Sequence, residues 1–373
     1  MKDLQLSSEK ILNSLNEGVY VCDLDRRIVF WSKSAERITG WQSQDVVGKR
    51  CLEDILCHVD KDNHRLCGEE YCPMHRSMIT GVTTTVPIIV FAQGKDGRRI
   101  PTQVTTAPIR NEAGEIIGGV ETFRDVSPML VDLERAQKIQ SQALEHDLPE
   151  DPRLRFSTFF MSYDIVGGDF HAIRMLDEDR YGFLLADMEG HGMAAALYAM
   201  HLSIQWNRHF QLVKKPTDFA AAVNAELVKL FGSVVTFATA VCGVIDARAG
   251  TLCFTAAGGP PPLIIHEDWT VEEPKSQGPP LGVMEDIPYR EKTVKLAPGD
   301  SILLFSDGAV EIQNARNEWL RVEGFTQILK SLDYPRTQLS MDVLEEALLK
   351  FSNDIRLQDD ITIIEVRFTG QSA

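Results

Sequence analysis

The hydrophobic pattern of the chain changes in the middle of its 373 residues, and this change limits the folds that the chain can adopt. From about residue 8 to 125, short β-like runs alternate with turn residues, and from about 150 onward strand and helix periods are mixed. The stretch between them is helical in pattern. We therefore predict two domains, residues 1–125 and 150–373, joined by a linker helix at 126–149. The apolar positions of this linker recur at three- and four-residue steps, at Leu130, Leu133, Ala136, Ile139, Ala143 and Leu144.

A single amphipathic helix between two domains has two ordinary uses. It can be a solvated strut that packs on one neighbouring domain, or it can be one half of a two-chain coiled coil. About two heptads of apolar repeats are too few to distinguish these structures. The helix pattern alone therefore leaves dimerisation through the linker open.

The two domains are expected to differ in architecture, and both are α+β. In the first, "GVYVCDLDRRIVFWS" predicts two strands, and "GKDGR" and "NEAGE" are hairpin turns between three further antiparallel strands. In the second, helices are inserted among β runs and do not alternate strictly with them. This order favours a layered sandwich over a doubly wound parallel sheet.

Charge and hydropathy exclude two classes of partner. The sequence has 54 acidic residues against 38 basic ones, a formal net charge of -16, and such a surface repels nucleic-acid phosphates. No stretch reaches the roughly 18 apolar residues of a membrane-spanning helix. The polar N-terminus has no apolar core of signal-peptide length. We expect a cytoplasmic protein with neither nucleic acid nor membrane as a partner.

Aspartates follow or precede apolar runs at four places in the second domain. They are Asp169 in "VGGDF", Asp187 in "FLLADMEGHG", Asp307 in "ILLFSDGAVE" and the pair Asp359 and Asp360 in "LQDDITII". Taken singly, each fits a helix cap or a turn. Taken together, they place several charges at the mouths of buried strands, which is costly unless a cation compensates them. An all-oxygen site suits Mg²⁺ or Mn²⁺, and two such ions that share a carboxylate activate water for attack on a phosphate ester.

The same segments resemble the motifs of a known family. In order along the chain they are "VGGDF", "ADMEGHGMAAAL", "FATAVCGVID", "AAGGPPPLII", "GPPLGV", "LLFSDGAVEIQN" and "DDITIIEV". This order is similar to that of bacterial metal-dependent serine phosphatases of the PPM superfamily, in their sporulation and stress-response branch. The resemblance covers residues 150–368 and implies an α-β-β-α sandwich with its site at one end of the two sheets.

The resemblance also implies the roles of individual residues. The family's aspartate that bridges two Mn²⁺ or Mg²⁺ ions corresponds to Asp187, and the backbone carbonyl that completes the ligands of the second ion corresponds to Met188. Asp169 corresponds to the acid that orients water around the second ion. Asp307 and Asp359 correspond to ligands of the first ion. Asp187 and Asp169 are thus the implied catalytic residues, and all five belong to the implied metal site.

Three neighbouring positions receive lesser roles. Asp360 is expected to be a supporting acid, and His191 in "GHG" to be structural or to lie beside the ligands, because the family varies that position. Gly259 stands where the family often has a histidine. This departure touches no implied metal ligand.

The first domain resembles a PAS domain more loosely. The matching text is "ILNSLNEGVYVCDLDRRIVFWSKSAERITGW" and the strands that close on "VETFRDVS". PAS domains bind small ligands, haem or flavin, or only other proteins. With this resemblance, we expect a homodimer formed through the PAS-like domain and the linker helix.

Four cysteines crowd one unusual insert of this domain, at Cys51, Cys57, Cys67 and Cys72. With the histidines around them, they could ligate zinc, another metal or an iron–sulfur cluster, or form a redox-sensitive disulfide. Their spacing matches no compact zinc motif. Free cysteines also commonly fill cores, so packed thiols are the alternative, although three of the four lie in polar sequence.

Together these features predict a sensor-regulated protein serine/threonine phosphatase that hydrolyses phosphoserine or phosphothreonine with a metal-activated water. The linker would pass the state of the PAS-like domain to the metal site. By resemblance, the substrate is a phosphorylated anti-sigma-factor antagonist of a partner-switching pathway. A catalytically silent phosphatase-like scaffold is one alternative, which the complete set of acids disfavours. A diguanylate cyclase is another, but its "GGDEF" hairpin needs a second acid where Phe170 stands.

Overall fold

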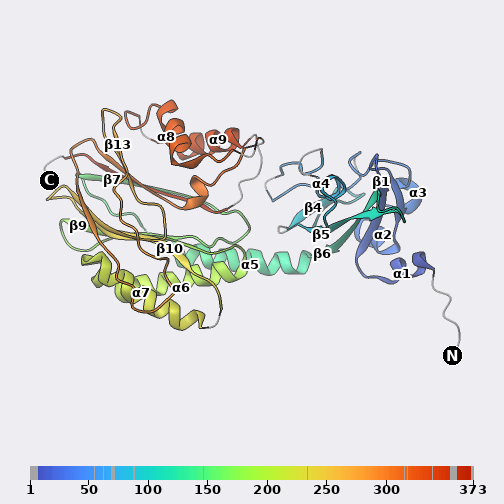
Figure 1. The fold of residues 1–373 in the computed structure, drawn as a ribbon, viewed down its shortest axis with the longest axis horizontal. Helices are drawn as coiled ribbons and strands as arrows, with labels where there is room; N and C mark the ends of the chain where they lie inside the picture. Colours follow the sequence, from blue (N-terminus) through green and yellow to red (C-terminus); the bar gives the residue numbers. More distant parts are fainter. Residues whose placement is uncertain are drawn as a thin grey trace. The chain divides into compact units, whose positions relative to one another are not determined.

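The structure is a computed structural model that describes residues 7–53, 55–61, 63–68, 72–86, 89–145, 147–232, 234–314, 316, 318–337, 339–352 and 359–370. It contains two compact units, Met1–Glu134 and Arg135–Ala373, and each is described by itself. The division falls inside helix α5 (Ser127–Leu144), which runs through most of the predicted linker (Figure 1). The linker helix is therefore shared between the two units.

The first unit is an antiparallel sheet with short helices, as predicted. The sheet has the strand order β2-β1-β6-β5-β3, and β4 pairs with β5. The predicted turn between β5 and β6 is present, and the Asn111 side chain accepts hydrogen bonds from the N–H groups of Ala113 and Glu115 there. The elements are α1 (Ser8–Ser14), β1 (Gly18–Asp23), β2 (Ile28–Trp31), α2 (Lys33–Thr39), α3 (Ser43–Val46), α4 (Pro73–Thr80), β3 (Thr84–Thr85), β4 (Val90–Gln93), β5 (Arg99–Arg110) and β6 (Ile116–Asp125).

The second unit consists of two antiparallel sheets and the helices that cover them. Its strands are β7 (Leu154–Met161), β8 (Phe170–Met175), β9 (Arg180–Met188), β10 (Ala238–Asp246), β11 (Thr251–Ala257), β12 (Leu263–Ile265), β13 (Val271–Glu272), β14 (Lys292–Lys295), β15 (Ser301–Phe305) and β16 (Ile361–Phe368). Its helices are α6 (Met193–His209), η1 (Phe210–Lys214), α7 (Pro216–Phe231), η2 (Asp307–Ala309), α8 (Arg321–Ser331) and α9 (Met341–Phe351).

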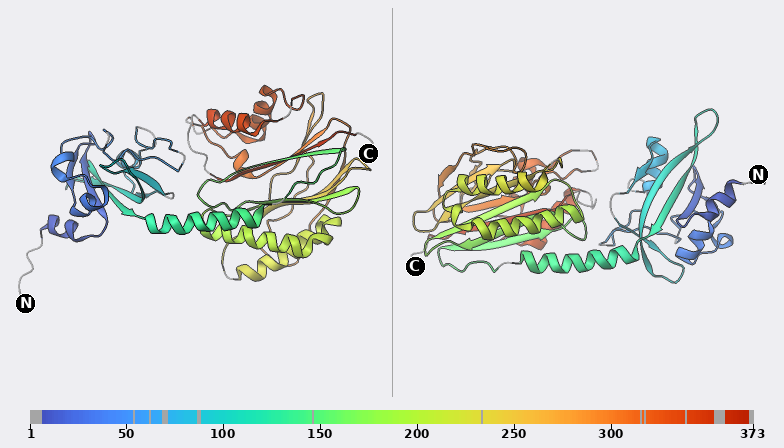
Figure 2. Two further views of the ribbon diagram at one scale, coloured as in Figure 1. Left: turned by 180° about the vertical axis from the view of Figure 1, so that it is seen from behind. Right: turned by 90° about the horizontal axis from the view of Figure 1, so that it is seen from below.

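These layers form the predicted α-β-β-α sandwich. One sheet has the order β14-β11-β10-β9-β8 and the other has the order β13-β12-β15-β16-β7. Helices α6 and α7 pack on the first sheet, and α8 and α9 pack on the second, on opposite outer faces of the unit (Figures 1 and 2). A third buried cluster fills the space between the two sheets.

Strand β9 shows why the sequence forms this layer. It is hydrophobic almost throughout, which is typical of a strand that is covered on both faces. Leu184 and Ala186 pack toward the helices, whereas Phe183 and Leu185 pack toward the second sheet. The strand therefore has no solvated face, and its run of apolar residues ends at the buried Asp187 and Met188.

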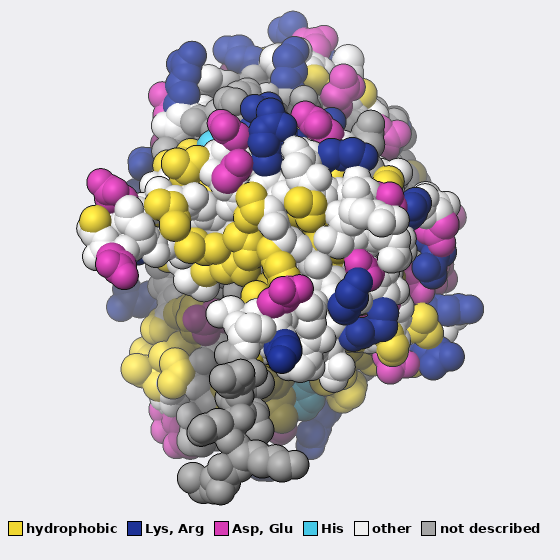
Figure 3. Space-filling model, turned by 90° about the vertical axis from the view of Figure 1, so that its right-hand side faces the viewer, with side chains coloured by type: hydrophobic (Ala, Val, Ile, Leu, Met, Phe, Trp, Pro, Cys, Tyr) yellow, Lys and Arg dark blue, Asp and Glu magenta, His cyan; other side chains and the backbone are white. Residues whose placement is uncertain are grey.

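Hydrophobic side chains also reach the surface. In the first unit, Ile11, Leu24 and Val29 are exposed, and Figure 3 shows one face of the molecule on which hydrophobic side chains gather between charged ones. Among the described residues, no helix combines the length and the apolar character needed to cross a bilayer.

Candidate active site

The two sheets bring the predicted acids to one end of the second unit. Asp187 is the penultimate residue of β9, and Asp169 directly precedes β8, its neighbour in the first sheet. In the second sheet, Asp307 begins the short helix η2 just after β15, and Asp359 lies two residues before β16, which pairs with β15. Segments far apart in the sequence thus converge.

Three of these carboxylates form a compact group. One oxygen from each of Asp187, Asp307 and Asp359 lies within 4.8 Å of the others. Among the described residues, this is the one group of three or more Asp, Glu, His or Cys side chains with that spacing. Its members come from both sheets, so the sandwich itself assembles the group.

Asp169 lies beside this group and is 2% exposed. The hydroxyl of Thr362 donates to its Oδ2 at 2.5 Å, and the hydroxyl of Ser306 in turn accepts a hydrogen bond from the N–H of Thr362. The other oxygen, Oδ1, is buried and has no hydrogen-bond partner among the described residues. Asp169 therefore has one oxygen, Oδ2, held by Thr362 and a second, Oδ1, that can accept a further hydrogen bond or bind a cation.

Asp360 has a different position from its neighbour Asp359. Its Oδ1 accepts the N–H of Tyr163 at 2.7 Å, and its Oδ2 accepts the N–H of Gly168. Both oxygens are thus occupied by backbone groups, one of them directly before Asp169. This arrangement gives Asp360 a supporting position, the one expected for it.

The carboxylates are crowded enough to disturb one another's protonation. Burial raises the pKa of Asp187 well above its ordinary value, and the charges of Asp169 and Asp307 raise it further. Burial and then the charge of Asp360 raise the pKa of Asp169. Burial raises the pKa of Asp359 to about 6. Burial and the neighbouring carboxylates thus both disfavour the ionised forms of these acids.

The donor set fits a hard divalent cation. All four aspartates offer oxygen, the donor that Mg²⁺ and Mn²⁺ prefer. Besides Asp169 Oδ1, Asp307 Oδ1 is also buried without a hydrogen-bond partner among the described residues. Buried polar atoms are nearly always paired, so these free oxygens favour a ligand role. The side chains that would hold the ions are those of Asp169, Asp187, Asp307 and Asp359. Met188, whose backbone carbonyl is also a predicted ligand, follows Asp187 as the last residue of β9.

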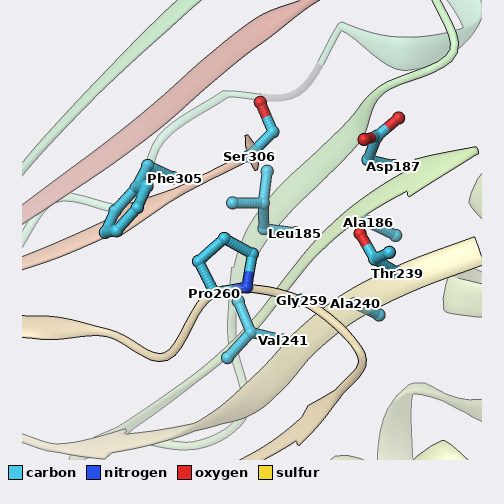
Figure 4. Close-up of a pocket in the computed structure, with 10 residues that line it drawn as sticks. All are labelled: Leu185, Ala186, Asp187, Thr239, Ala240, Val241, Gly259, Pro260, Phe305 and Ser306. Carbon is cyan, nitrogen blue, oxygen red and sulfur yellow. The ribbon is translucent and has the colours of Figure 1, made fainter. Parts of the chain in front are cut away.

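A small cavity lies against Asp187. It has a volume of about 10 Å³, and Thr239, Gly259 and Ser306 are among the residues that line it (Figure 4). This is room for about one water molecule. A Cβ on Gly259 would lie only 3.3 Å from backbone atoms of Ala240, so the glycine that replaces the family's frequent histidine packs tightly on β10.

His191 lies near the acids but is not one of the compact group. Its ring packs edge-on against Tyr163, with ring centroids 5.3 Å apart, and it acts on the pKa of Asp359 in the lowering direction, against the larger effect of burial. His191 therefore stands beside the carboxylates and packs on an aromatic ring.

Two residues that support the site were not predicted from the sequence. Gly308 is one, because a Cβ there would lie 2.0 Å from the carbonyl oxygen of Asp360. Gln140 of α5 is the other: its Nε2 donates to the carbonyl of Gly167 at 2.7 Å, and its Oε1 accepts the N–H of Gly167 at 3.3 Å. Gly167 is two residues before Asp169. The sequence held one sign of the role of Gln140. It lies four positions after Ala136, on the apolar stripe of the linker helix, where a polar residue is unexpected.

The cysteines of the first unit do not form a ligand group of this kind among the described residues. Cys51 and Cys72 are each 4% exposed, which agrees with the packed-thiol alternative for these two residues. Burial raises the pKa of both thiols and raises the pKa of Cys67 to about 12. Protonated thiols are poor nucleophiles and poor ligands. None of the four cysteines forms a disulfide in the structure. Residues 69–71 of the same insert lie outside the described residues.

Comparisons with known proteins agree with the two units. The family model of Stage II sporulation protein E (SpoIIE) matches residues 177–369, and the PAS fold model matches residues 8–126. Among curated proteins, phosphoserine phosphatase RsbP of Bacillus subtilis is 26% identical over 183 residues, which cover 48% of this chain and 45% of RsbP. Phosphoserine phosphatase RsbU of the same organism is 24% identical over 243 residues, which cover 63% of this chain and 70% of RsbU. The chain thus spans under half the length of RsbP.

Solved structures share the fold of the second unit. The SiaA-PP2C domain of Pseudomonas aeruginosa has a TM-score of 0.55 and 24% identity, with 65% of this chain and 97% of that domain covered. The RsbU and RsbW domains of Rv1364c from Mycobacterium tuberculosis give a TM-score of 0.52 and 23% identity, with 62% and 64% covered. These likenesses establish a PP2C-type fold.

Proposed function

Because the chain belongs to the family of Stage II sporulation protein E, we propose that it is a metal-dependent protein serine/threonine phosphatase regulated by its PAS unit. The observation that carries this proposal is the group formed by Asp187, Asp307 and Asp359, with Asp169 beside it. Two sheets supply these acids at one end of the sandwich, where burial raises the pKa values of Asp187 and Asp359 and disfavours their charged forms unless a cation offsets them.

The chain's own residues have distinct tasks in this proposal. Two divalent ions held at these oxygens would supply an acidified water and positive charge against a phosphoryl group. Asp187 has oxygens of Asp307 and Asp359 within 4.8 Å and is affected by the charge of Asp169, which supports the shared-ligand role that the family resemblance implies for it. Asp169 keeps Oδ2 on Thr362 and has Oδ1 free to accept a hydrogen bond from water. Helix α6 begins near this site without a side-chain cap, so its first N–H groups are available to an anion.

We also propose a substrate class and a homodimer. RsbP and RsbU are named phosphoserine phosphatases, which supports a phosphoserine or phosphothreonine of a protein as substrate here. We take that protein to be a phosphorylated anti-sigma-factor antagonist. Exposed Val131 and Ile139 on α5 support a homodimer through the linker helix and the PAS unit.

Hydrolysis of p-nitrophenyl phosphate by the full chain tests the proposal. With Mn²⁺ the chain should release p-nitrophenol, and EDTA should stop the reaction. A folded chain that stays inactive over a range of Mn²⁺ and Mg²⁺ concentrations would instead be the silent scaffold.

A further inference from the structure

A groove in the second unit is lined by residues that follow Asp307 closely in the sequence. It has a volume of about 370 Å³ and is lined by Val310, Glu311, Trp319, Arg321 and Val322. This volume is within the range of specific binding sites. No residue of the groove belongs to the carboxylate group described above, so the groove is a separate feature.

Backbone hydrogen bonds join the groove to the site. The N–H groups of Val310 and Glu311 donate to the carbonyl of Asp307, at 2.8 and 2.7 Å. The N–H of Arg321 donates to the carbonyl of Val310 at 2.8 Å. A molecule whose reacting group lies at Asp307 therefore has the groove directly next to it.

The side chains of the groove are those of a protein-binding surface. Trp319 is 45% exposed, although tryptophan has the largest apolar side chain of the amino acids. Tryptophan and arginine are among the residues most enriched in binding hot spots. The Arg321 guanidinium makes no hydrogen bond or ion pair with any described residue. In a chain of net charge -16, an unpaired arginine beside an acidic site is available to an external anion.

The backbone holds Arg321 in a costly conformation. Its φ is +56°, a left-handed value that is unfavourable for a residue with a long side chain. Such strain persists where the surrounding structure enforces it, and it is frequent at binding sites. Here the bridge between Gln313 and Trp319 and the Arg321 bond to Val310 enforce it. The backbone at Arg321 is thus held in place before any partner binds.

We propose that this groove binds the polypeptide on either side of the phosphorylated residue of the substrate. Trp319 and Val322 pack against an apolar side chain, Arg321 pairs with an acidic side chain near the phosphoserine, and the Glu311 carboxylate accepts a backbone N–H of the extended peptide. The inference rests on the proposed function, because it takes the phosphoserine to lie at the carboxylate group. It adds the substrate preference: phosphoproteins with acidic and apolar residues next to the phosphoserine.

Two substrates separate the groove from the chemistry. The full chain with Mn²⁺ is assayed on p-nitrophenyl phosphate, which is too small to reach the groove, and on a synthetic phosphoserine peptide with Asp and Leu near the phosphoserine. Arg321→Ala and Trp319→Ala should each reduce kcat/KM for the peptide by about tenfold, mostly through KM, and leave p-nitrophenyl phosphate hydrolysis within about twofold. Arg316→Ala, an exposed arginine of the same loop that does not line the groove, should change neither.

A charge reversal makes the test specific. Arg321→Glu should prefer the same peptide with Lys in place of Asp. Equal losses on both substrates would mean that Arg321 acts on the phosphate and would overturn the inference, as would an unchanged peptide kcat/KM. If the wild-type chain turns over neither substrate, the proposed function fails, and anisotropy of a fluorescent phosphopeptide decides the groove separately: binding that Arg321→Ala weakens supports it, and binding that does not depend on Arg321 overturns it.

Discussion

Neutralising Asp187 should stabilise the metal-free protein, although the residue is central to the site. The change is Asp187→Asn, which keeps the size of the side chain and removes its charge. In the metal-free chain, Asp187 has carboxylate oxygens of Asp307 and Asp359 within 4.8 Å. Burial and the charges of Asp169 and Asp307 raise the pKa of Asp187, so its ionised form is unfavourable in the fold.

The magnitude follows from two limits. Two unit charges 4.8 Å apart repel by about 3.5 kcal/mol at an effective dielectric constant of about 20. Alternatively, the folded protein takes up a proton at a group with an unfolded pKa of about 3.9, which at about pH 7.5 costs about 5 kcal/mol. The metal-free wild type takes whichever of these two states costs less free energy. We therefore expect Asp187→Asn to raise the free energy of unfolding by about 2–4 kcal/mol, or the Tm by about 5–10 °C for a unit of this size.

The sign of the pH dependence follows from the raised pKa. Above the unfolded pKa, the folded state binds more protons than the unfolded state, so the stability of the metal-free wild type falls as pH rises from about 4. At about pH 5, protonating Asp187 costs only about 1.5 kcal/mol. The difference in stability between Asp187→Asn and the wild type should therefore be smaller at that pH.

Differential scanning fluorimetry in EDTA and in Mn²⁺ measures these effects. Mn²⁺ should raise the Tm of the wild type and leave Asp187→Asn almost unchanged. Glu189→Gln is the matched control, because Glu189 is exposed and two residues away, and it should behave like the wild type. A metal-free Asp187→Asn that is no more stable than the wild type, or that keeps the full Mn²⁺ shift, would refute the reasoning.

Three further outcomes are expected. Gln140→Met leaves the buried N–H and carbonyl of Gly167 without partners and should lower the free energy of unfolding by about 2–3 kcal/mol in urea titrations, whereas Gln142→Met, at an exposed position of the same helix, should change it little. Gly308→Ala forces a Cβ against the Asp360 carbonyl and should cost about 3 kcal/mol by the same assay, and a neutral result would mean that the strand ends can separate freely. Because burial raises their pKa values, the cysteines of the first unit should react with a thiol reagent at about pH 8 at least about tenfold more slowly in the native than in the denatured chain, and fast native labelling would restore the redox hypothesis.

Local patterns in the sequence were sufficient to predict the acids and a layered α+β fold for the second unit. Each strand period and each helical stripe is a short-range signal, and Asp187, Asp307 and Asp359 were visible as charges at the ends of apolar runs. The α-β-β-α arrangement of these elements came from the resemblance to a family. The distances among the acids required the pairing of β15 with β16 and of β8 with β9, which depends on long-range packing.

The residues that escaped prediction act through backbone contacts. Gly308 is required because the chain approaches the Asp360 carbonyl, and "SDG" by itself indicates only a turn. Gln140 bonds to Gly167, 27 residues away, and its stripe position was the one local sign. The burial of Cys51 and Cys72 was one of two alternatives left open by the sequence, because an insert with many polar residues can still contribute single side chains to a core.

A Mn²⁺ titration with two simultaneous readouts tests the central claim most directly. Free Mn²⁺ is followed by electron paramagnetic resonance while p-nitrophenyl phosphate turnover is measured in the same samples of wild type and Asp187→Ala. We predict that turnover rises with Mn²⁺ bound to the wild type, and that Asp187→Ala loses both while it keeps its fold. Turnover that persists in EDTA, or full Mn²⁺ binding and activity in Asp187→Ala, would contradict the assignment of the aspartate group as the catalytic metal site.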